Sequence, residues 1–136
     1  MKTLDDVKFI DFNCFAEADG NLVPIESNRH VPFEIKRMFY VYGVRGKKKR
    51  GKHSHFKTQQ VLICLNGCCE VICHDGLQER KYILNSPDKG LFIPEMIWDE
   101  QVYTTVDTIL LVLSNTYYDK EDYIDSWERY LQHVKI

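Results

Sequence analysis

The chain has 136 residues, of which 44% are hydrophobic, and a formal net charge of −2 at pH 7. This length suits a single domain spanning residues 1–136, with a core that needs no cross-links. The near balance of 18 basic and 20 acidic residues gives no broad positive field for nucleic acid or an anionic membrane. The first residues are acidic where a signal peptide would be apolar, and no stretch is long and apolar enough to span a bilayer, so we expect a cytoplasmic protein.

Short strand-like segments follow one another along most of the chain. Each is rich in apolar and β-branched residues and is bounded by Gly, Pro, Asn or Asp, which favour turns. The segments cover residues 7–12, 23–25, 35–41, 60–64, 68–73, 80–84, 90–93, 102–103 and 108–113. This rhythm predicts an all-β fold, a sandwich or a closed barrel of the jelly-roll type.

The pattern changes after residue 114. Ile124, Trp127, Leu131 and Val134 recur at three- and four-residue spacing, which predicts a short amphipathic C-terminal helix packed against the barrel. Asp119 is a candidate for its N-terminal cap.

The chain has five cysteines, an odd number that argues against a complete disulfide framework. Most of them fall in apolar strand-like segments and lack the paired spacing of a zinc site. They are Cys14, Cys64, Cys68, Cys69 and Cys73. We therefore expect free thiols, most of them buried.

Two histidines, His53 and His55, carry the strongest functional signal. Alternate residues of a strand point to the same side, so the two imidazoles should share one pocket. Such a pair can move protons, bind a metal or respond to pH, and burying it without use is costly. Arg50 precedes the pair at the end of a basic run and could present a guanidinium to phosphate at the pocket mouth.

The surrounding pattern resembles the metal site of cupins, with one important change. Gln60 stands where the cupin motif has a glutamate, and an amide is a poor ligand for a divalent cation. The remaining ligand set is His53, His55 and Asp99, and two histidines with one carboxylate can hold non-haem iron. A metal-dependent cupin enzyme therefore stays as an alternative.

Several motifs in order resemble the dTDP-4-keto-6-deoxyglucose 3,4-ketoisomerases, a family of cupin-fold sugar-nucleotide isomerases. The resemblance runs from Asp11 onward and is carried by residues 32–37, 50–55, 60–64, 84–91, 112–113, 117–119 and 122–124. It implies a jelly-roll barrel and a metal-free reaction without a cofactor, in which a carbonyl moves from C4 to C3 of a dTDP-linked 6-deoxyhexose. It also implies a homodimer.

The resemblance implies roles for particular residues. His53 and His55 become the acid–base pair, with His55 favoured as the base at C3 and His53 as its partner at the sugar oxygens. Asp99 is a candidate for steering which face of C4 receives the proton. The further candidates for substrate contact are Arg50 and Arg37 at the diphosphate, with a structural ion pair as the alternative for each. Trp98 and Tyr40 are candidates at thymine or sugar, with core packing as the alternative for both. A non-catalytic sugar-nucleotide-binding cupin is the remaining alternative.

Overall fold

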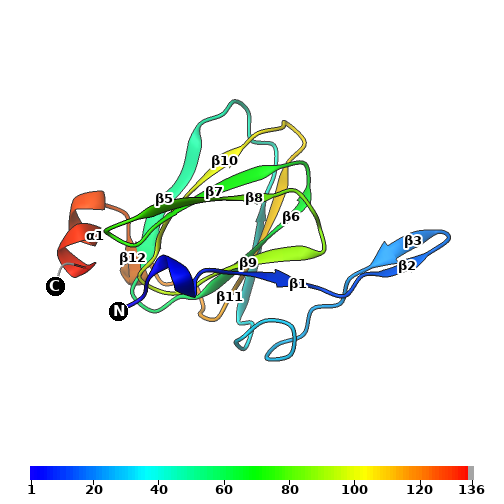
Figure 1. The fold of residues 1–136 in the computed structure, drawn as a ribbon, viewed down its shortest axis with the longest axis horizontal. Coiled ribbons are helices and arrows are strands. Elements are labelled where there is room, and N and C mark those ends of the chain that lie inside the picture. The colour runs from blue at the N-terminus through cyan, green and yellow to red at the C-terminus, as the bar shows by residue number, and fades with distance from the viewer. Residues whose placement is uncertain (135–136) are drawn as a thin grey trace.

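The structure is a computed structural model that describes residues 1–134, and β-strands dominate it (Figure 1). The elements in chain order are η1 (Leu4–Asp6), β1 (Lys8–Asp11), β2 (Phe15–Glu17), β3 (Gly20–Leu22), β4 (Arg37–Val41), β5 (Lys49–His55), β6 (Gln60–Asn66), β7 (Cys69–His74), β8 (Glu79–Leu84), β9 (Lys89–Ile93), β10 (Trp98–Tyr103), β11 (Ile109–Ser114), η2 (Lys120–Asp122), β12 (Tyr123–Ile124) and α1 (Trp127–Val134). The all-β prediction with one C-terminal helix is confirmed.

Ten of the strands form two five-stranded antiparallel sheets. One has the order β1-β9-β6-β11-β4 and the other β12-β5-β10-β7-β8. The main core lies between them and takes side chains from both, among them Leu62 and Leu110 from the first sheet and Val71 and Tyr103 from the second. The sheets therefore close around one core as a jelly-roll barrel of the cupin type.

The outer face of each sheet is covered by a different segment. The chain between β3 and β4 packs Val31 and Phe33 on the outer side of β6 and β11. Helix α1 packs Tyr130 and Val134 against Trp98 on the outer side of the second sheet. The Tyr130 hydroxyl lies 2.9 Å from the carbonyl of His74 and 3.0 Å from that of Met96, which ties the helix to the barrel.

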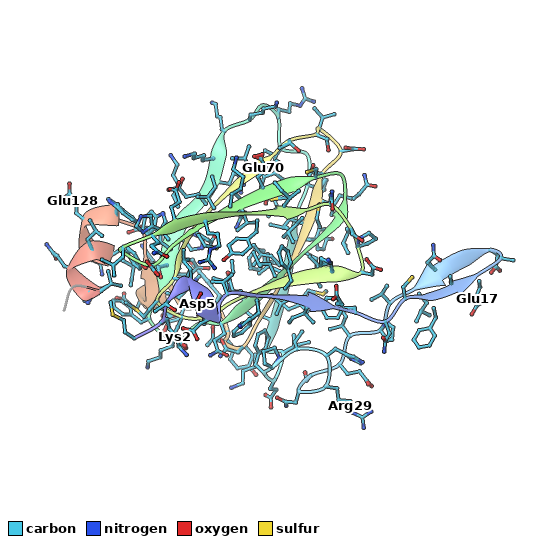
Figure 2. The ribbon with its side chains drawn as sticks, in the orientation of Figure 1. Lys2, Asp5, Glu17, Arg29, Glu70 and Glu128 are labelled. Carbon is cyan, nitrogen blue, oxygen red and sulfur yellow. The ribbon has the colours of Figure 1, made fainter. Side chains whose placement is uncertain are left out.

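The third sheet is a hairpin of β2 and β3 that projects from the barrel (Figure 1). Its side chains Phe15 and Leu22 are 54% and 59% exposed. Charged side chains such as Glu17, Arg29 and Glu128 point away from the barrel (Figure 2).

Most predicted strands are confirmed, with ends that differ by one or two residues. The strand predicted at 23–25 is wrong: this segment has no strand, because Pro24 lacks the N–H that a ladder needs. The short strand predicted at 102–103 is the end of β10, which begins at Trp98. Asp99 therefore lies within a strand.

The predicted C-terminal helix exists but begins later than the apolar spacing indicates. Ile124 belongs to β12, and α1 begins at Trp127. Asp119 caps η2, where its side chain accepts from the Glu121 amide, so its assignment as the cap of α1 is wrong. Ser126 precedes α1, and its hydroxyl accepts from the Arg129 amide, as an N-cap does. Within residues 1–134 no helix is both long and apolar enough to cross a membrane.

Candidate active site

His53 and His55 lie together, as their spacing predicts. Their rings are 5.0 Å apart between centroids and meet edge to face at 78°. His55 is buried, and His53 is partly exposed. The pair therefore combines a deep imidazole with a more accessible one.

The two histidines have different neighbours because β5 lies between β12 and β10. His53 stands opposite Asp99 of β10, and His55 stands opposite Tyr123 of β12. Side chains of directly paired residues project from the same face of a sheet. The site thus has a carboxylate beside one histidine and a phenol beside the other.

Tyr123 joins the histidines to a basic group. Its ring centroid is 4.5 Å from that of His55 and 5.2 Å from that of His53. The Arg37 guanidinium donates from Nη2 to the Tyr123 hydroxyl at 3.3 Å, and it also lies over the Tyr118 ring at 5.5 Å. Arg37, predicted as a substrate contact, is therefore beside the histidine pair.

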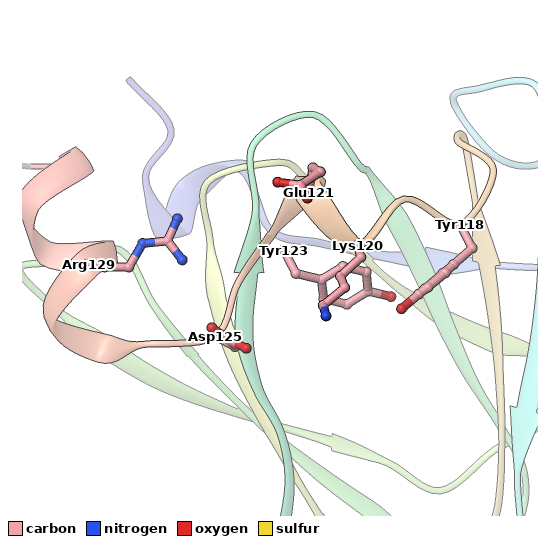
Figure 3. A pocket seen from close by; sticks show the side chains of 6 residues that line it. All are labelled: Tyr118, Lys120, Glu121, Tyr123, Asp125 and Arg129. Carbon is pink, nitrogen blue, oxygen red and sulfur yellow. The ribbon is translucent and has the colours of Figure 1, made fainter.

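Tyr123 also lines a cavity of about 380 Å³, whose lining includes neither His53 nor His55. Figure 3 shows the phenols of Tyr118 and Tyr123 close to each other, and their ring centroids are 5.8 Å apart. Lys120 and Arg129 add positive charge to the lining, and Glu121 and Asp125 add negative charge.

The surroundings of His55 favour its neutral form. Burial is the main cause that lowers its pKa, with smaller contributions from the positive charges of His53 and Arg37, and together they bring it to about 3. Its Nε2 is buried without a hydrogen-bond partner among residues 1–134. His55 therefore has an unused nitrogen and no positive charge near neutral pH.

Asp99 is buried on the inner face of β10. Burial raises the pKa of its carboxyl group, whereas the His53 charge and a hydrogen bond from Gln101 act in the opposite direction. The Gln101 amide donates from Nε2 to Asp99 Oδ1 at 3.2 Å.

A β-bulge brings Arg50 to the same face as His53. The register between β5 and β10 shifts between Asp99 and Glu100, so that Asp99 pairs with His53 and Gln101 pairs with Arg50. Simple alternation would place residues 50 and 53 on opposite faces. The extra residue is Lys52, which has a φ of 55°.

Trp98 and Tyr40 are not brought to the histidine pair. Trp98 lies on the outer face of β10, where it packs edge to face on Trp127 and its indole N–H donates to Glu100. Tyr40 is 60% exposed on β4 and stacks on Tyr42. Within this chain, Trp98 serves helix packing, and Tyr40 belongs to an open surface.

The ligand set of the metal-dependent alternative is not assembled. Within residues 1–134 no group of three or more His, Cys, Asp or Glu side chains is placed to hold a metal ion. Asp99 accepts from Gln101, and His55 faces Tyr123 instead of completing a triangle with His53 and Asp99.

The cysteines are free thiols, as predicted. Burial raises the pKa of Cys64 to about 11 and that of Cys69 to about 12, so both stay protonated in the core. Cys73, opposite Asp99 on β7, is affected in the same direction.

Sequence reasoning missed Tyr123, Gln101 and Tyr103 as members of the site. Gln101 and Tyr103 alternate with Asp99, so a correct assignment of β10 would have placed them on its face. Tyr123 lies in residues 122–124, which carry the family resemblance, but local alternation could not place it beside His55, because their strand pairing is distant in sequence.

A jelly-roll barrel with an ionisable pair inside it defines a class of small cupin-fold enzymes. Residues 5–135 match the FdtA family, described as WxcM-like, C-terminal. The chain belongs to the FdtA family, which confirms the resemblance noted from its motifs.

Named relatives agree in length and fold. The chain is 39% identical over 132 residues to a TDP-4-oxo-6-deoxy-alpha-D-glucose-3,4-oxoisomerase of Aneurinibacillus thermoaerophilus, covering 95% of each. It resembles the crystal structure of QdtA, a sugar 3,4-ketoisomerase of Thermoanaerobacterium thermosaccharolyticum in complex with TDP, with a TM-score of 0.94, 39% identity and coverage of 97% and 96%. It also resembles WlaRA, a TDP-fucose-3,4-ketoisomerase of Campylobacter jejuni, with a TM-score of 0.90, 35% identity and coverage of 96% of each.

Proposed function

We propose that this protein is a sugar-nucleotide 3,4-ketoisomerase that converts dTDP-4-keto-6-deoxyglucose into a dTDP-3-keto-6-deoxyhexose. The observation that carries the proposal is the pair of His53 and His55, side by side on one strand with Arg37 close to them. The named relatives, which are 3,4-ketoisomerases of TDP-linked sugars, support the substrate class.

The reaction needs two kinds of proton transfer. The C4 ketone acidifies the proton on C3, and a base that removes it produces an enediolate. A proton must then reach C4, while the hydroxyl proton moves from the oxygen on C3 to the oxygen on C4. The atoms balance without a redox partner or a metal.

His55 is the base that we assign to the carbon atoms. It is neutral near pH 7 and has an unused Nε2, so it is ready to accept a proton without first losing one. Burial and the charges of His53 and Arg37 lower its pKa, so the imidazolium formed at C3 readily gives its proton up to C4. The same low pKa weakens His55 as a base toward C3, so the enediolate must itself be stabilised. His53, which is more accessible, moves protons at the two sugar oxygens.

Arg37 is the residue that we assign to stabilising the negative charge of the enediolate. Its guanidinium already donates to Tyr123, and its Nε is buried without a partner among the described residues 1–134. A fixed donor aimed at a developing oxyanion acts strongly when water is excluded. Arg50, on the same face but nearer the surface, is the better candidate for the diphosphate.

A homodimer is part of the proposal. Two apolar surfaces of the chain are exposed: the projecting hairpin with Phe15 and Leu22, and the outer face of β4 with Met38 and Tyr40. Exposed apolar surface of this kind is typical of protein interfaces. Sedimentation velocity of the native protein should give a dimer, and a monomer at micromolar concentration would refute this part.

The direct test is incubation of purified protein with dTDP-4-keto-6-deoxyglucose, followed by NMR of the sugar. We expect a 3-keto product after exhaustive chelation as well as before it. Activity that chelation abolishes and iron or zinc restores would support the metal-dependent alternative. Tight binding of the sugar nucleotide without turnover would support a binding protein.

A further inference from the structure

Three buried polar side chains form a row on the inner face of β10. Asp99, Gln101 and Tyr103 occupy alternate positions of this strand, and we call them the polar ladder. Tyr103 belongs to the main apolar core. Buried polar groups destabilise a fold unless hydrogen bonds satisfy them. The donor and acceptor in each bond therefore show how each of these side chains is oriented.

The bonds of the polar ladder run in one direction. The Tyr103 hydroxyl donates to Gln101 Oε1 at 3.1 Å, and Gln101 Nε2 donates to Asp99 Oδ1 at 3.2 Å. Because the amide oxygen of Gln101 accepts from the phenol, its N–H end is turned toward Asp99. One oxygen of Asp99 is thereby occupied, and the carboxyl group is held in one orientation.

His53 is the basic residue that stands opposite Asp99, and its charge acts to lower the pKa of the carboxyl group, although no hydrogen bond joins the two side chains among residues 1–134. It pairs with Asp99 in the register between β5 and β10, where paired side chains stand about 5 Å apart at Cβ. On the opposite side Asp99 pairs with Cys73, whose thiol stays protonated because burial raises its pKa. The backbone is also close: a Cβ added to Gly51 would lie 3.2 Å from Asp99 Oδ1.

We propose that the polar ladder positions His53, with Asp99 accepting a hydrogen bond from one ring nitrogen so that the other nitrogen faces the sugar oxygens. Asp99 thereby fixes the tautomer of His53. Gln101 and Tyr103 act through Asp99 and are positioning residues that need not touch the sugar. This inference rests on the proposed function, in which His53 moves the protons of the two sugar oxygens.

The test is ¹⁵N NMR of the imidazoles in the substrate-free protein, with the His53 signals assigned from a His53→Asn spectrum. We expect one tautomer in the native protein. In Asp99→Asn the amide oxygen keeps the bond from Gln101, so the side chain presents N–H to His53 and the tautomer should switch. An unchanged tautomer in Asp99→Asn would overturn the proposal.

Tyr103→Phe is a gentler variant, because it frees the Gln101 amide to rotate but keeps the ring. We expect a mixture of His53 tautomers and a kcat lowered about two- to fivefold, against roughly 10- to 100-fold for Asp99→Asn, with little change in KM. Tyr82→Phe is the matched control, since Tyr82 lies in the same core on β8 outside the polar ladder, and it should leave the tautomer unchanged. Equal effects of the two Phe variants on the His53 tautomer and on kcat would refute the proposal that the polar ladder positions His53.

The NMR readout separates the inference from the function on which it rests. If the native protein shows no isomerase activity, the proposed function fails, and the tautomer measurement still decides whether Asp99 orients His53. If activity is present but Asp99→Asn keeps both the native tautomer and the native kcat, only the polar ladder fails.

Discussion

His53 and His55 are the same residue type on the same strand, yet their surroundings assign them different chemistry. His55 is buried against Tyr123 near Arg37, and its pKa is lowered to about 3. His53 is partly exposed and stands opposite a carboxyl group. The strands beside β5, more than the spacing of the pair, give the two imidazoles different environments, and the proposed roles of base and proton carrier rest on this difference.

Removing each imidazole in turn should have the largest effect on turnover. We expect His55→Asn to lower kcat by roughly 10²–10⁴-fold, the usual contribution of a general acid–base group, because no other group is assigned to the C3 proton. His53→Asn should fall near the lower end of this range, since water can carry part of the proton traffic between oxygens. NMR progress curves measure both, with circular dichroism to confirm the fold. Near-normal turnover by a folded His55→Asn protein would remove His55 from the mechanism.

Removing the charge beside His55 should have the next largest effect. Arg37→Gln should lower kcat by roughly 10²-fold, because a donor to the enediolate oxygen is lost. Arg45→Gln is the matched control, since Arg45 is exposed in the loop before β5. Equal kinetics of the two variants would mean that Arg37 does not act on the reaction.

The pH dependence of stability tests the burial of His55. Its pKa of about 3 in the folded protein lies below the 6.5 of an ordinary histidine, so the unfolded chain binds more protons between these values. The free energy of unfolding should therefore fall as pH drops from 6.5 toward 3, with a contribution from this residue of about 1.4 kcal/mol per pH unit. Urea unfolding at several pH values should show that His55→Asn lacks this part of the slope. Identical slopes would contradict the burial.

The smallest expected effect comes from the bulge beside His53. Gly51 has a φ of 80°, and a Cβ there would lie 3.2 Å from Asp99 Oδ1, so Gly51→Ala should strain the backbone and press on the carboxyl group. We expect a stability loss of about 1–2 kcal/mol, and a few-fold lower kcat. Gly20→Ala is the control, because Gly20 lies in the projecting hairpin with open space around its Cα. A loss of activity in both variants would argue against a local effect on Asp99.

The sequence predicted the features that depend on neighbouring residues along the chain. The alternation of side chains along a strand was enough to place His53 and His55 on one side, and turn residues delimited most strands. The strand at 23–25 failed because a short apolar segment can be buried as irregular chain, and Pro24 opposes pairing.

Long-range pairing explains the parts that the sequence could not supply. Arg50 reaches the face of His53 through a bulge, and Tyr123 reaches His55 through a two-residue strand at the other end of the chain. Trp98 was a candidate either for contact with thymine or sugar or for core packing, and it lies on the outer face of β10 and packs under α1. Register is set by all the strands of a sheet together, so a single motif cannot fix it.

The most direct test of the division of work is deuterium exchange at C3 of dTDP-4-keto-6-deoxyglucose in D₂O, followed by ¹H NMR. The native protein should replace the C3 proton during turnover, and His55→Asn should leave it in place. His53→Asn should still exchange this proton while forming product slowly. Exchange that persists in His55→Asn and disappears in His53→Asn would show that the two roles are reversed.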